Sequence, residues 1–130
     1  MTTYFIDTNI LIYYLAGAIP NEEKPVIDRI LQESFNISII TRIELLGWKD
    51  HTPEGLAKAR NLLDCAQCLP LTDTLAEKTI ELRTGVTISL PDAVIAVSAL
   101  SLDATLITRN ERDFDSVPGL AIYNPFGKYS

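Results

Sequence analysis

The chain has 130 residues, a length typical of one domain, and 47% of them are hydrophobic, which excludes an intrinsically disordered protein. Its net charge of −6 argues against a protein that grips nucleic acid with a broad basic face, but it is compatible with a nuclease that brings metal ions to its substrate. The longest uncharged stretch, residues 8–21, is too short to cross a bilayer, and no basic segment precedes it. We therefore expect a soluble, cytoplasmic protein that forms one domain over residues 1–130.

Short apolar runs alternate with longer helical periods along the chain. In chain order we expect a strand over 4–6, helices over 9–16 and 22–33, a strand over 36–40, helices over 41–49 and 53–64, a strand over 69–71, helices over 73–83 and 91–102, a strand over 104–108, a helical turn from 110 and a strand over 120–123. Strands that alternate with helices imply parallel pairing through right-handed crossovers. The predicted fold is therefore of the α/β class, a three-layer α/β/α sandwich around a mainly parallel sheet.

Two of these helices carry specific packing predictions. In the helix over 9–16, Leu11, Ile12 and Leu15 are expected on one face. The helix over 91–102 is almost entirely apolar, so it is expected to be buried on more than one side. Trp48 and the pair Tyr13-Tyr14 either complete the core or serve as interface aromatics.

The cysteines and the single histidine do not form a metal site or a redox site by their pattern. Cys65 and Cys68 end a helical segment rather than begin one, and zinc would need four ligands. We interpret them as two reduced thiols. His51 precedes Thr52-Pro53, a loop signature, and is interpreted as a solvated loop residue.

Four acidic residues stand at or within the first turn of an expected helix, and three of these turns follow a strand directly. Each has a structural explanation of its own: Asp7 as an N-cap, Thr41-x-x-Glu44 and Asn110-x-x-Asp113 as capping boxes, and Asp92 as a charge that favours the helix dipole. Because the carboxyl ends of parallel strands meet at one edge of a sheet, the four carboxylates are expected to lie together.

Such crowding is unfavourable, since two like charges 4 Å apart repel by about 4 kcal/mol at an effective dielectric constant of 20. A helix cap does not require it, because Ser, Thr or Asn caps as well. Clustered carboxylates without a lysine indicate a hard divalent cation with oxygen ligands, Mg²⁺ or Mn²⁺.

The sequence resembles a known family, the PIN-domain ribonucleases, and among them the VapC-type toxins of bacterial type II toxin–antitoxin pairs. The resemblance covers essentially the whole chain and is carried by four segments in the family's order and spacing: Phe5-Ile-Asp-Thr-Asn9, Thr41-x-x-Glu-Leu-Leu-Gly47, Leu90-Pro-Asp-Ala-Val-Ile-Ala96 and Thr108-Arg-Asn-x-x-Asp-Phe114.

The resemblance implies that Asp7, Glu44, Asp92 and Asp113 form the catalytic and metal-binding site. We expect Asp7 and Asp92 to bind metal directly, and Glu44 and Asp113 to bind a second metal or orient the attacking water. Asp115 is the alternative to Asp113. Side chains expected to support the ligands or metal-bound waters are Thr8, Thr108 and Asn110. Arg109 and Arg112 either contact RNA phosphates or are solvated surface residues.

The expected function is a Mg²⁺-dependent endoribonuclease, with Mn²⁺ able to substitute, that hydrolyses RNA through a metal-activated water. The family also implies a cognate antitoxin protein as partner, and a homodimer. A Mg²⁺-binding phospho-acceptor signalling module is the alternative, but it would want a lysine where Thr108-Arg109 stands. A haloacid-dehalogenase-like phosphatase would want Asp at position 9, which is Asn, and an inactive interaction domain would have lost one of the four acids.

Overall fold

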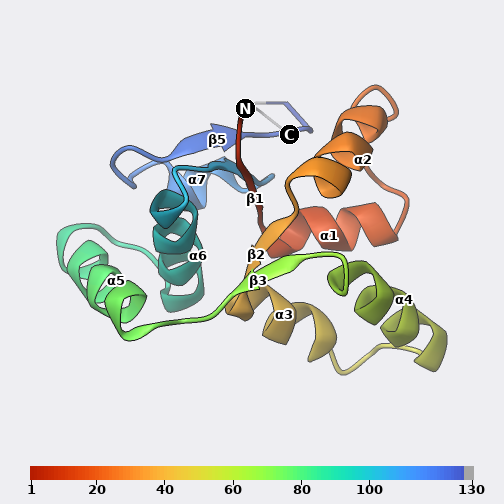
Figure 1. The fold of residues 1–130 in the computed structure, drawn as a ribbon, viewed down its shortest axis with the longest axis horizontal. Helices are drawn as coiled ribbons and strands as arrows, with labels where there is room; N and C mark the ends of the chain where they lie inside the picture. Colours follow the sequence, from red (N-terminus) through yellow and green to blue (C-terminus); the bar gives the residue numbers. More distant parts are fainter. Residues whose placement is uncertain (128–130) are drawn as a thin grey trace.

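The computed structural model describes residues 1–127, and its centre is a five-stranded sheet (Figure 1). The order of the strands is β3-β2-β1-β4-β5, and all four pairings between neighbours are parallel. The strands are β1 (Tyr4–Ile6), β2 (Asn36–Ser38), β3 (Gln67–Leu69), β4 (Thr105–Ile107) and β5 (Ala121–Tyr123). The parallel α/β architecture predicted from the sequence is confirmed.

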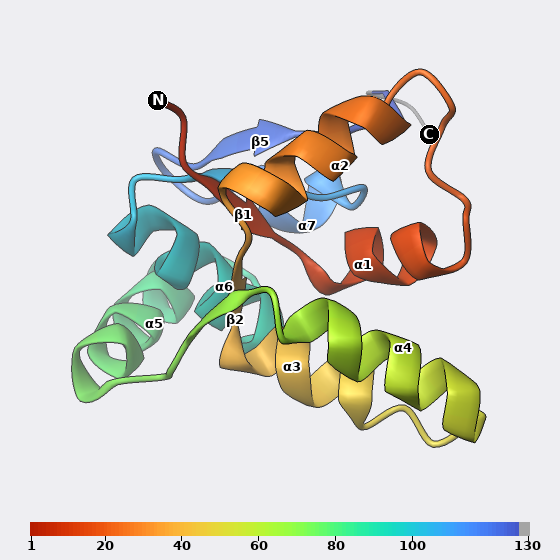
Figure 2. The same ribbon diagram turned by 45° about the vertical axis from the view of Figure 1, so that its right-hand side comes forward.

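Two hydrophobic cores lie on the two faces of the sheet, because successive residues of a strand point to opposite sides. Ile6 of β1 and Ile107 of β4 face one core, while Phe5 and Leu106, their neighbours in sequence, face the other. The first core is covered by α1 (Thr8–Leu15), α2 (Lys24–Glu33) and α4 (Pro53–Leu63), and the second by α5 (Asp73–Gly85), α6 (Leu90–Ser101) and α7 (Glu111–Phe114). Figure 2 shows α5 and α6 on one side of the strands and α1 and α4 on the other.

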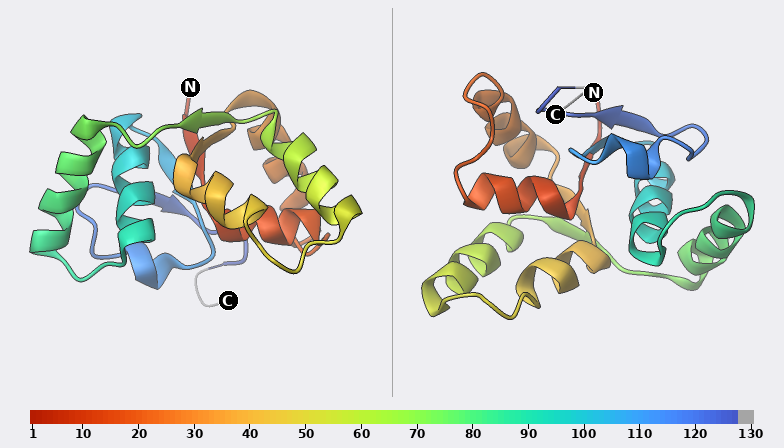
Figure 3. Two further views of the ribbon diagram at one scale, coloured as in Figure 1. Left: turned by 90° about the horizontal axis from the view of Figure 1, so that it is seen from below. Right: turned by 180° about the vertical axis from the view of Figure 1, so that it is seen from behind.

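The helix α3 (Ile39–Leu46) lies between the two groups, in contact with α1, α4 and α6 (Figure 3). It begins earlier than predicted. The strand expected over 36–40 ends at Ser38, whose hydroxyl caps α3 by accepting a hydrogen bond from the backbone N–H of Ile40 at 3.0 Å. The strand expected over 69–71 is also displaced, to Gln67–Leu69, because Pro70 has no N–H to donate to the ladder.

The packing predictions are confirmed for α6 and corrected for α1. Seven consecutive residues of α6, 93–99, are buried. In α1 the buried apolar residues are Ile10 and Leu11, whereas Ile12, expected on the buried face, is 51% exposed. Of the aromatic residues, Tyr13 and Tyr14 pack against the first core. Trp48 is 57% exposed and belongs to neither core.

The two cysteines do not form a disulfide bond. Cys65 and Cys68 are free thiols, the first exposed and the second half-buried.

Among residues 1–127 no single helix combines the length and apolar composition needed to cross a membrane. The helices α5 and α6 meet those two criteria only as a pair, with a bend of 118° between them.

Candidate active site at the carboxyl edge of the sheet

Asp7 directly follows β1 and is buried, with 5% of its surface exposed. Its Oδ1 accepts a hydrogen bond from the backbone N–H of Thr8 at 2.8 Å, so it is the N-cap of α1 that the sequence predicted. Its Oδ2 accepts from the hydroxyl of Thr108 and from the amide of Asn9, both at 2.8 Å. The carboxylate is therefore held in one orientation by groups from β1's end, α1 and the segment after β4.

The environment nevertheless favours the neutral form of this carboxyl. The pKa of Asp7 is raised from 3.8 to about 6, chiefly by burial and also by the negative charges of Asp92 and Glu44, which together outweigh the lowering effect of the hydrogen bonds from Thr108 and Thr8. A nearby cation would reverse this effect. A buried carboxylate that is fully oriented but electrostatically disfavoured is typical of a functional site.

Glu44 lies in the last turn of α3, and the structure excludes the capping box that was one interpretation of Thr41 and Glu44. Because Ser38 is the N-cap, neither Thr41 nor Glu44 occupies a capping position. The hydroxyl of Thr8 lies 2.7 Å from Glu44 Oε1 and 2.9 Å from the hydroxyl oxygen of Thr41, which is fully buried. Since a hydroxyl carries one hydrogen, Thr8 donates to the Glu44 carboxylate and accepts from Thr41. The pattern Thr41-x-x-Glu44 thus orients a carboxylate at the mouth of a pocket.

Asp92 stands in the first turn of α6, where Ser89 is the N-cap and accepts a hydrogen bond from the backbone N–H of Asp92 at 3.3 Å. Ser89 therefore interacts with both parts of residue 92, because its side chain also forms a hydrogen bond with the Asp92 carboxylate. The pKa of this carboxyl is raised, chiefly by burial and also by the charges of Asp113 and Glu44, against the lowering effect of the hydrogen bond with Ser89.

Asp113 lies in α7, and its negative charge raises the pKa of Asp92. The capping box expected with Asn110 is wrong, because α7 has no side-chain cap hydrogen bond. Asp115, the alternative to Asp113, occupies the C-cap position of α7. Of these two acids, only Asp113 is among the causes of the raised pKa of Asp92.

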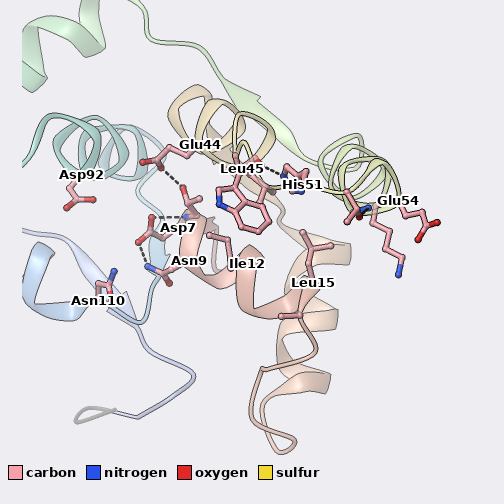
Figure 4. Close-up of a pocket in the computed structure, with 16 residues that line it drawn as sticks. Asp7, Asn9, Ile12, Leu15, Glu44, Leu45, His51, Glu54, Asp92 and Asn110 are labelled. Atoms are coloured by element: carbon pink, nitrogen blue, oxygen red, sulfur yellow. Dashed lines mark hydrogen bonds between the residues drawn. The ribbon is translucent and has the colours of Figure 1, made fainter.

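Asp7, Glu44 and Asp92 line one pocket of about 850 Å³, together with Asn110. Figure 4 shows these four side chains at one end of the pocket, while Ile12, Leu15, Leu45, His51 and Glu54 line the rest. The pocket thus has an acidic end at the carboxyl edge of the sheet and a mainly apolar groove between α1 and the α3–α4 segment. We call the two parts the acid site and the groove.

Three residues were predicted to support the acids, and two arginines were predicted either to contact RNA or to be solvated. Thr8 and Thr108 donate hydrogen bonds to Glu44 and Asp7, as described above. Asn110 lines the pocket, and its backbone N–H donates to the Thr108 hydroxyl at 3.0 Å. Arg109 forms cation–π contacts: its guanidinium lies 5.0 Å from the ring centroid of Tyr13 and 4.2 Å from that of Phe126. Arg112 is exposed on α7.

Asn9 and Thr41 contribute to the site without having been assigned to it from the sequence. Asn9 donates to Asp7, and its side-chain oxygen accepts a hydrogen bond from the backbone N–H of Arg109 at 3.1 Å. This amide therefore ties the start of α1 to the segment after β4. An amide residue two places after Asp7, in an otherwise apolar helix, is the signal that could have identified it. For Thr41 the capping-box interpretation concealed the role.

The donor set of the acid site fits a hard divalent cation in kind and in charge. It offers carboxylate oxygens from three elements, and within residues 1–127 the only salt bridge is Lys24–Asp28, so no lysine or arginine of this part of the chain pairs with the acids. The carboxylate oxygens do not lie at coordination distance from one common point. Within residues 1–127 no group of three or more His, Cys, Asp or Glu side chains is placed to hold a metal ion.

Comparisons with known proteins agree with the fold and the resemblance. The model of the PIN domain family matches residues 4–120. None of the curated proteins matches the chain in sequence. Among solved structures, a toxin–antitoxin complex from Klebsiella pneumoniae contains a chain that is 30% identical, with a TM-score of 0.78; the match covers 97% of this chain and 100% of that one.

Two further structures are VapBC complexes. DNA-bound VapBC from Salmonella typhimurium matches with 26% identity, a TM-score of 0.79 and coverage of 96% of this chain and 99% of that one. VapBC2 from Rickettsia felis, bound to a DNA fragment from its promoter, matches with 24% identity, a TM-score of 0.79 and coverage of 95% and 98%. The last of these similarities shows the fold alone.

Proposed function

The chain belongs to the PIN domain family, and from this premise we propose that it is a metal-dependent endoribonuclease and the toxin of a toxin–antitoxin pair. PIN-domain toxins are generally nucleases, and the match to a chain of a toxin–antitoxin complex supports that class of activity. The single observation that carries the finer proposal is the acid site. Asp7, Glu44 and Asp92 line one pocket, none of them forms a salt bridge with a cation of residues 1–127, and Asp113 adds its charge.

In the proposed reaction, Asp7 and Asp92 would hold Mg²⁺ or Mn²⁺, and Glu44 and Asp113 would bind a second ion or orient water. Bound there, such a cation would lower the pKa of a water and shield the charge of the phosphate that the water attacks. Burial and mutual repulsion make the acid site a poor place for four free carboxylates, which favours cation binding at neutral pH.

The other polar groups of the site orient the acids. Thr108 and Asn9 fix Asp7 Oδ2, and the Thr8 backbone fixes Oδ1, so this side chain cannot rotate without losing hydrogen bonds. The Thr8 hydroxyl holds Glu44 Oε1, and Glu44 retains a second oxygen for water or metal. Groups that hold metal ligands in this way typically contribute tenfold to a hundredfold to metal affinity or activity.

The test is cleavage of single-stranded RNA by the purified protein with Mg²⁺, with Mn²⁺ and with excess chelator. We expect cleavage that requires metal and disappears in Asp92→Asn. Failure of the wild-type protein to cut any RNA under these conditions would contradict the proposal. Acid-stable trapping of an aspartyl phosphate would instead favour the signalling module.

Two partner relations belong to the same proposal. The relatives in toxin–antitoxin complexes support a cognate antitoxin, which we expect to co-purify with the protein and to suppress its cleavage of RNA. A homodimer, implied by the family resemblance, is checked by light scattering of the isolated protein. Both remain predictions.

A further inference from the structure

The groove beside the acid site contains the only tryptophan of the sequence, Trp48. We propose that Trp48 is the stacking platform for a nucleobase of single-stranded RNA, next to the phosphate held at the acid site. The proposal rests on the proposed function and adds to it a residue that positions the substrate.

The position of Trp48 follows from the end of α3. Glu44 lies in the last turn of α3, and Trp48 follows the C-cap residue of this helix, four positions after Glu44. Gly47 ends the helix, and a Cβ at this position would lie 2.6 Å from the backbone oxygen of Ile43. The glycine thus permits the close turn that carries the chain from Glu44 to Trp48, and the two side chains line one pocket.

The orientation of the indole is supported by His51. The two rings are nearly perpendicular, at 83°, with centroids 5.0 Å apart. His51 is itself anchored, because its Nε2 lies 2.7 Å from the backbone oxygen of Leu45, an acceptor, so Nε2 carries a proton and donates. The expectation of a freely solvated loop histidine is therefore corrected. Trp48 keeps 57% of its surface exposed while one neighbouring ring restrains it.

The chemistry of the groove fits a nucleotide strand. Its walls include the apolar side chains of Ile12 and Leu15, and Lys58 of α4 contributes a positive charge to the lining. Glu54, one helical turn before Lys58, lies at the end of the pocket remote from Asp92 (Figure 4). A strand whose scissile phosphate lies at the metal-loaded acids would place an adjacent base over Trp48 and a following phosphate toward Lys58. Single-stranded nucleic acid is bound in this way, by aromatic platforms combined with backbone cations.

Because Trp48 is unique, its fluorescence reports on base stacking directly. The binding experiment uses the Asp92→Asn variant, which leaves the RNA uncut, and titrates it with a short single-stranded RNA and with inorganic polyphosphate of equal charge. We expect the RNA to quench the fluorescence and polyphosphate to leave it unchanged. Equal responses to both polyanions, or no quenching by RNA, would overturn the proposal.

The cleavage experiment compares Trp48→Leu with Trp48→Tyr on an RNA that the wild-type protein cuts at one position. Loss of a stacked base is expected to lower kcat/KM about tenfold or more in Trp48→Leu, while Trp48→Tyr retains most of it. The matched control is Ile80→Ala, whose side chain is 56% exposed on α5 and lies outside the groove.

Abasic substitutions in the RNA make the assignment specific. Removing the base that stacks on Trp48 is expected to slow the wild-type protein and to have little further effect on Trp48→Leu. A Trp48→Leu variant that cuts the intact RNA as efficiently as the wild type overturns the proposal and fits a Trp48 covered by a partner protein. If the wild type cuts no RNA, the proposed function fails, and the quenching experiment still decides separately whether Trp48 binds bases.

Discussion

Two groups of carboxylates in this molecule have opposite surroundings. Asp28 and Glu23, which we call the α2 carboxylates, have donors as partners: Asp28 accepts from the Tyr14 hydroxyl at 2.7 Å and lies 3.9 Å from Lys24 Nζ, and Glu23 accepts from the Tyr123 hydroxyl. In the acid site, carboxylates face other carboxylates. The α2 carboxylates join α2 to α1 and β5. In the acid site, Asp7 and Glu44 also accept hydrogen bonds, but acidic neighbours raise the pKa of Asp7 and Asp92.

The effect on proton affinity separates the two groups further. Around α2 it is the tyrosine partners whose pKa values are raised. The pKa of Tyr14 rises to about 12 chiefly through its hydrogen bond to Asp28, and that of Tyr123 rises to about 12 through burial and its hydrogen bond to Glu23. In the acid site the carboxyls themselves change, and Asp7 reaches about 6. The two groups thus differ in which pKa values the fold raises, those of the tyrosine partners around α2 and those of the carboxyls in the acid site.

The largest expected effect is on catalysis. Glu44→Gln and Asp92→Asn keep the shape of the side chain and remove its charge, so each is expected to lower RNA cleavage by about a hundredfold or more, because a metal-held site contributes several kcal/mol. Without metal, both variants should be as stable as the wild type or more stable, since repulsion is lost.

The matched control for this prediction is Asp28→Asn. It also removes one negative charge, but from a carboxylate paired with Tyr14 and Lys24. We expect it to cleave RNA at the wild-type rate and to lose some stability. A Glu44→Gln variant with wild-type activity would remove Glu44 from the site and reduce the acid group to three.

The next effect is on stability against pH. The folded state raises the pKa of Asp7 from 3.8 to about 6, so it keeps the proton over this interval while the unfolded chain releases it. The contribution of Asp7 to metal-free stability is therefore complete below pH 3.8 and is lost as the pH rises through 6, a change of about 3 kcal/mol.

Chemical denaturation of the wild type and of Asp7→Asn across this range isolates the effect, because the difference cancels other titrating groups. The Tyr14 and Tyr123 contributions have a different window, since their stabilisation persists below pH 10 and is lost as the pH rises toward 12. A free-energy difference between wild type and Asp7→Asn that does not vary from pH 4 to pH 7 would contradict the raised pKa.

A smaller effect is expected from the group that orients Asp7. Thr108→Val removes the hydroxyl that donates to Asp7 Oδ2 but keeps the shape of the side chain. Metal affinity is expected to fall by about tenfold to a hundredfold, measured by calorimetric titration with Mn²⁺. An unchanged affinity would show that Asn9 and the Thr8 backbone suffice to hold the carboxylate.

The smallest effect belongs to the structural group. Tyr123→Phe removes the hydroxyl that donates to Glu23 and is expected to cost about 1 kcal/mol in the free energy of unfolding. RNA cleavage and metal affinity should be unchanged, as measured beside the variants above. A loss of activity at constant stability would mean that the two groups of carboxylates are coupled.

Much of the architecture was predictable because strand and helix periods are strong in this sequence. The alternation of elements predicted the parallel sheet, and the apolar run in α6 predicted its burial. The start of α3 was not predictable in the same way, since Ile37, Ile39 and Ile40 are β-branched and favour a strand, and Ser38 stands inside that run. Only the cap geometry shows that the helix begins at Ile39.

The grouping of Asp7, Glu44 and Asp92 at one pocket could be predicted from the alternation of strands and helices, because a parallel sheet brings the segments after its strands to one edge. Their roles could not, since a carboxylate at a helix start fits a cap as well as a site. Asp7 is both, whereas Glu44 proves to be neither a cap nor part of a capping box. The exposure of Ile12 and Trp48 also depends on tertiary packing, because a residue that lines a groove has the same composition as one in a core.

The most direct test of the central claim, that the four carboxylates form one divalent-metal site, is thermal unfolding at pH 7 with Mg²⁺, with Mn²⁺ and with chelator. At a hundredfold excess over the dissociation constant, binding to the native state adds about 2.7 kcal/mol, which raises Tm by roughly 10 °C for a domain of this size. We expect this rise in Tm in the wild type and in Asp28→Asn, and no such rise in Asp92→Asn. Wild-type unfolding curves that superimpose in millimolar Mg²⁺, in Mn²⁺ and in chelator would contradict it.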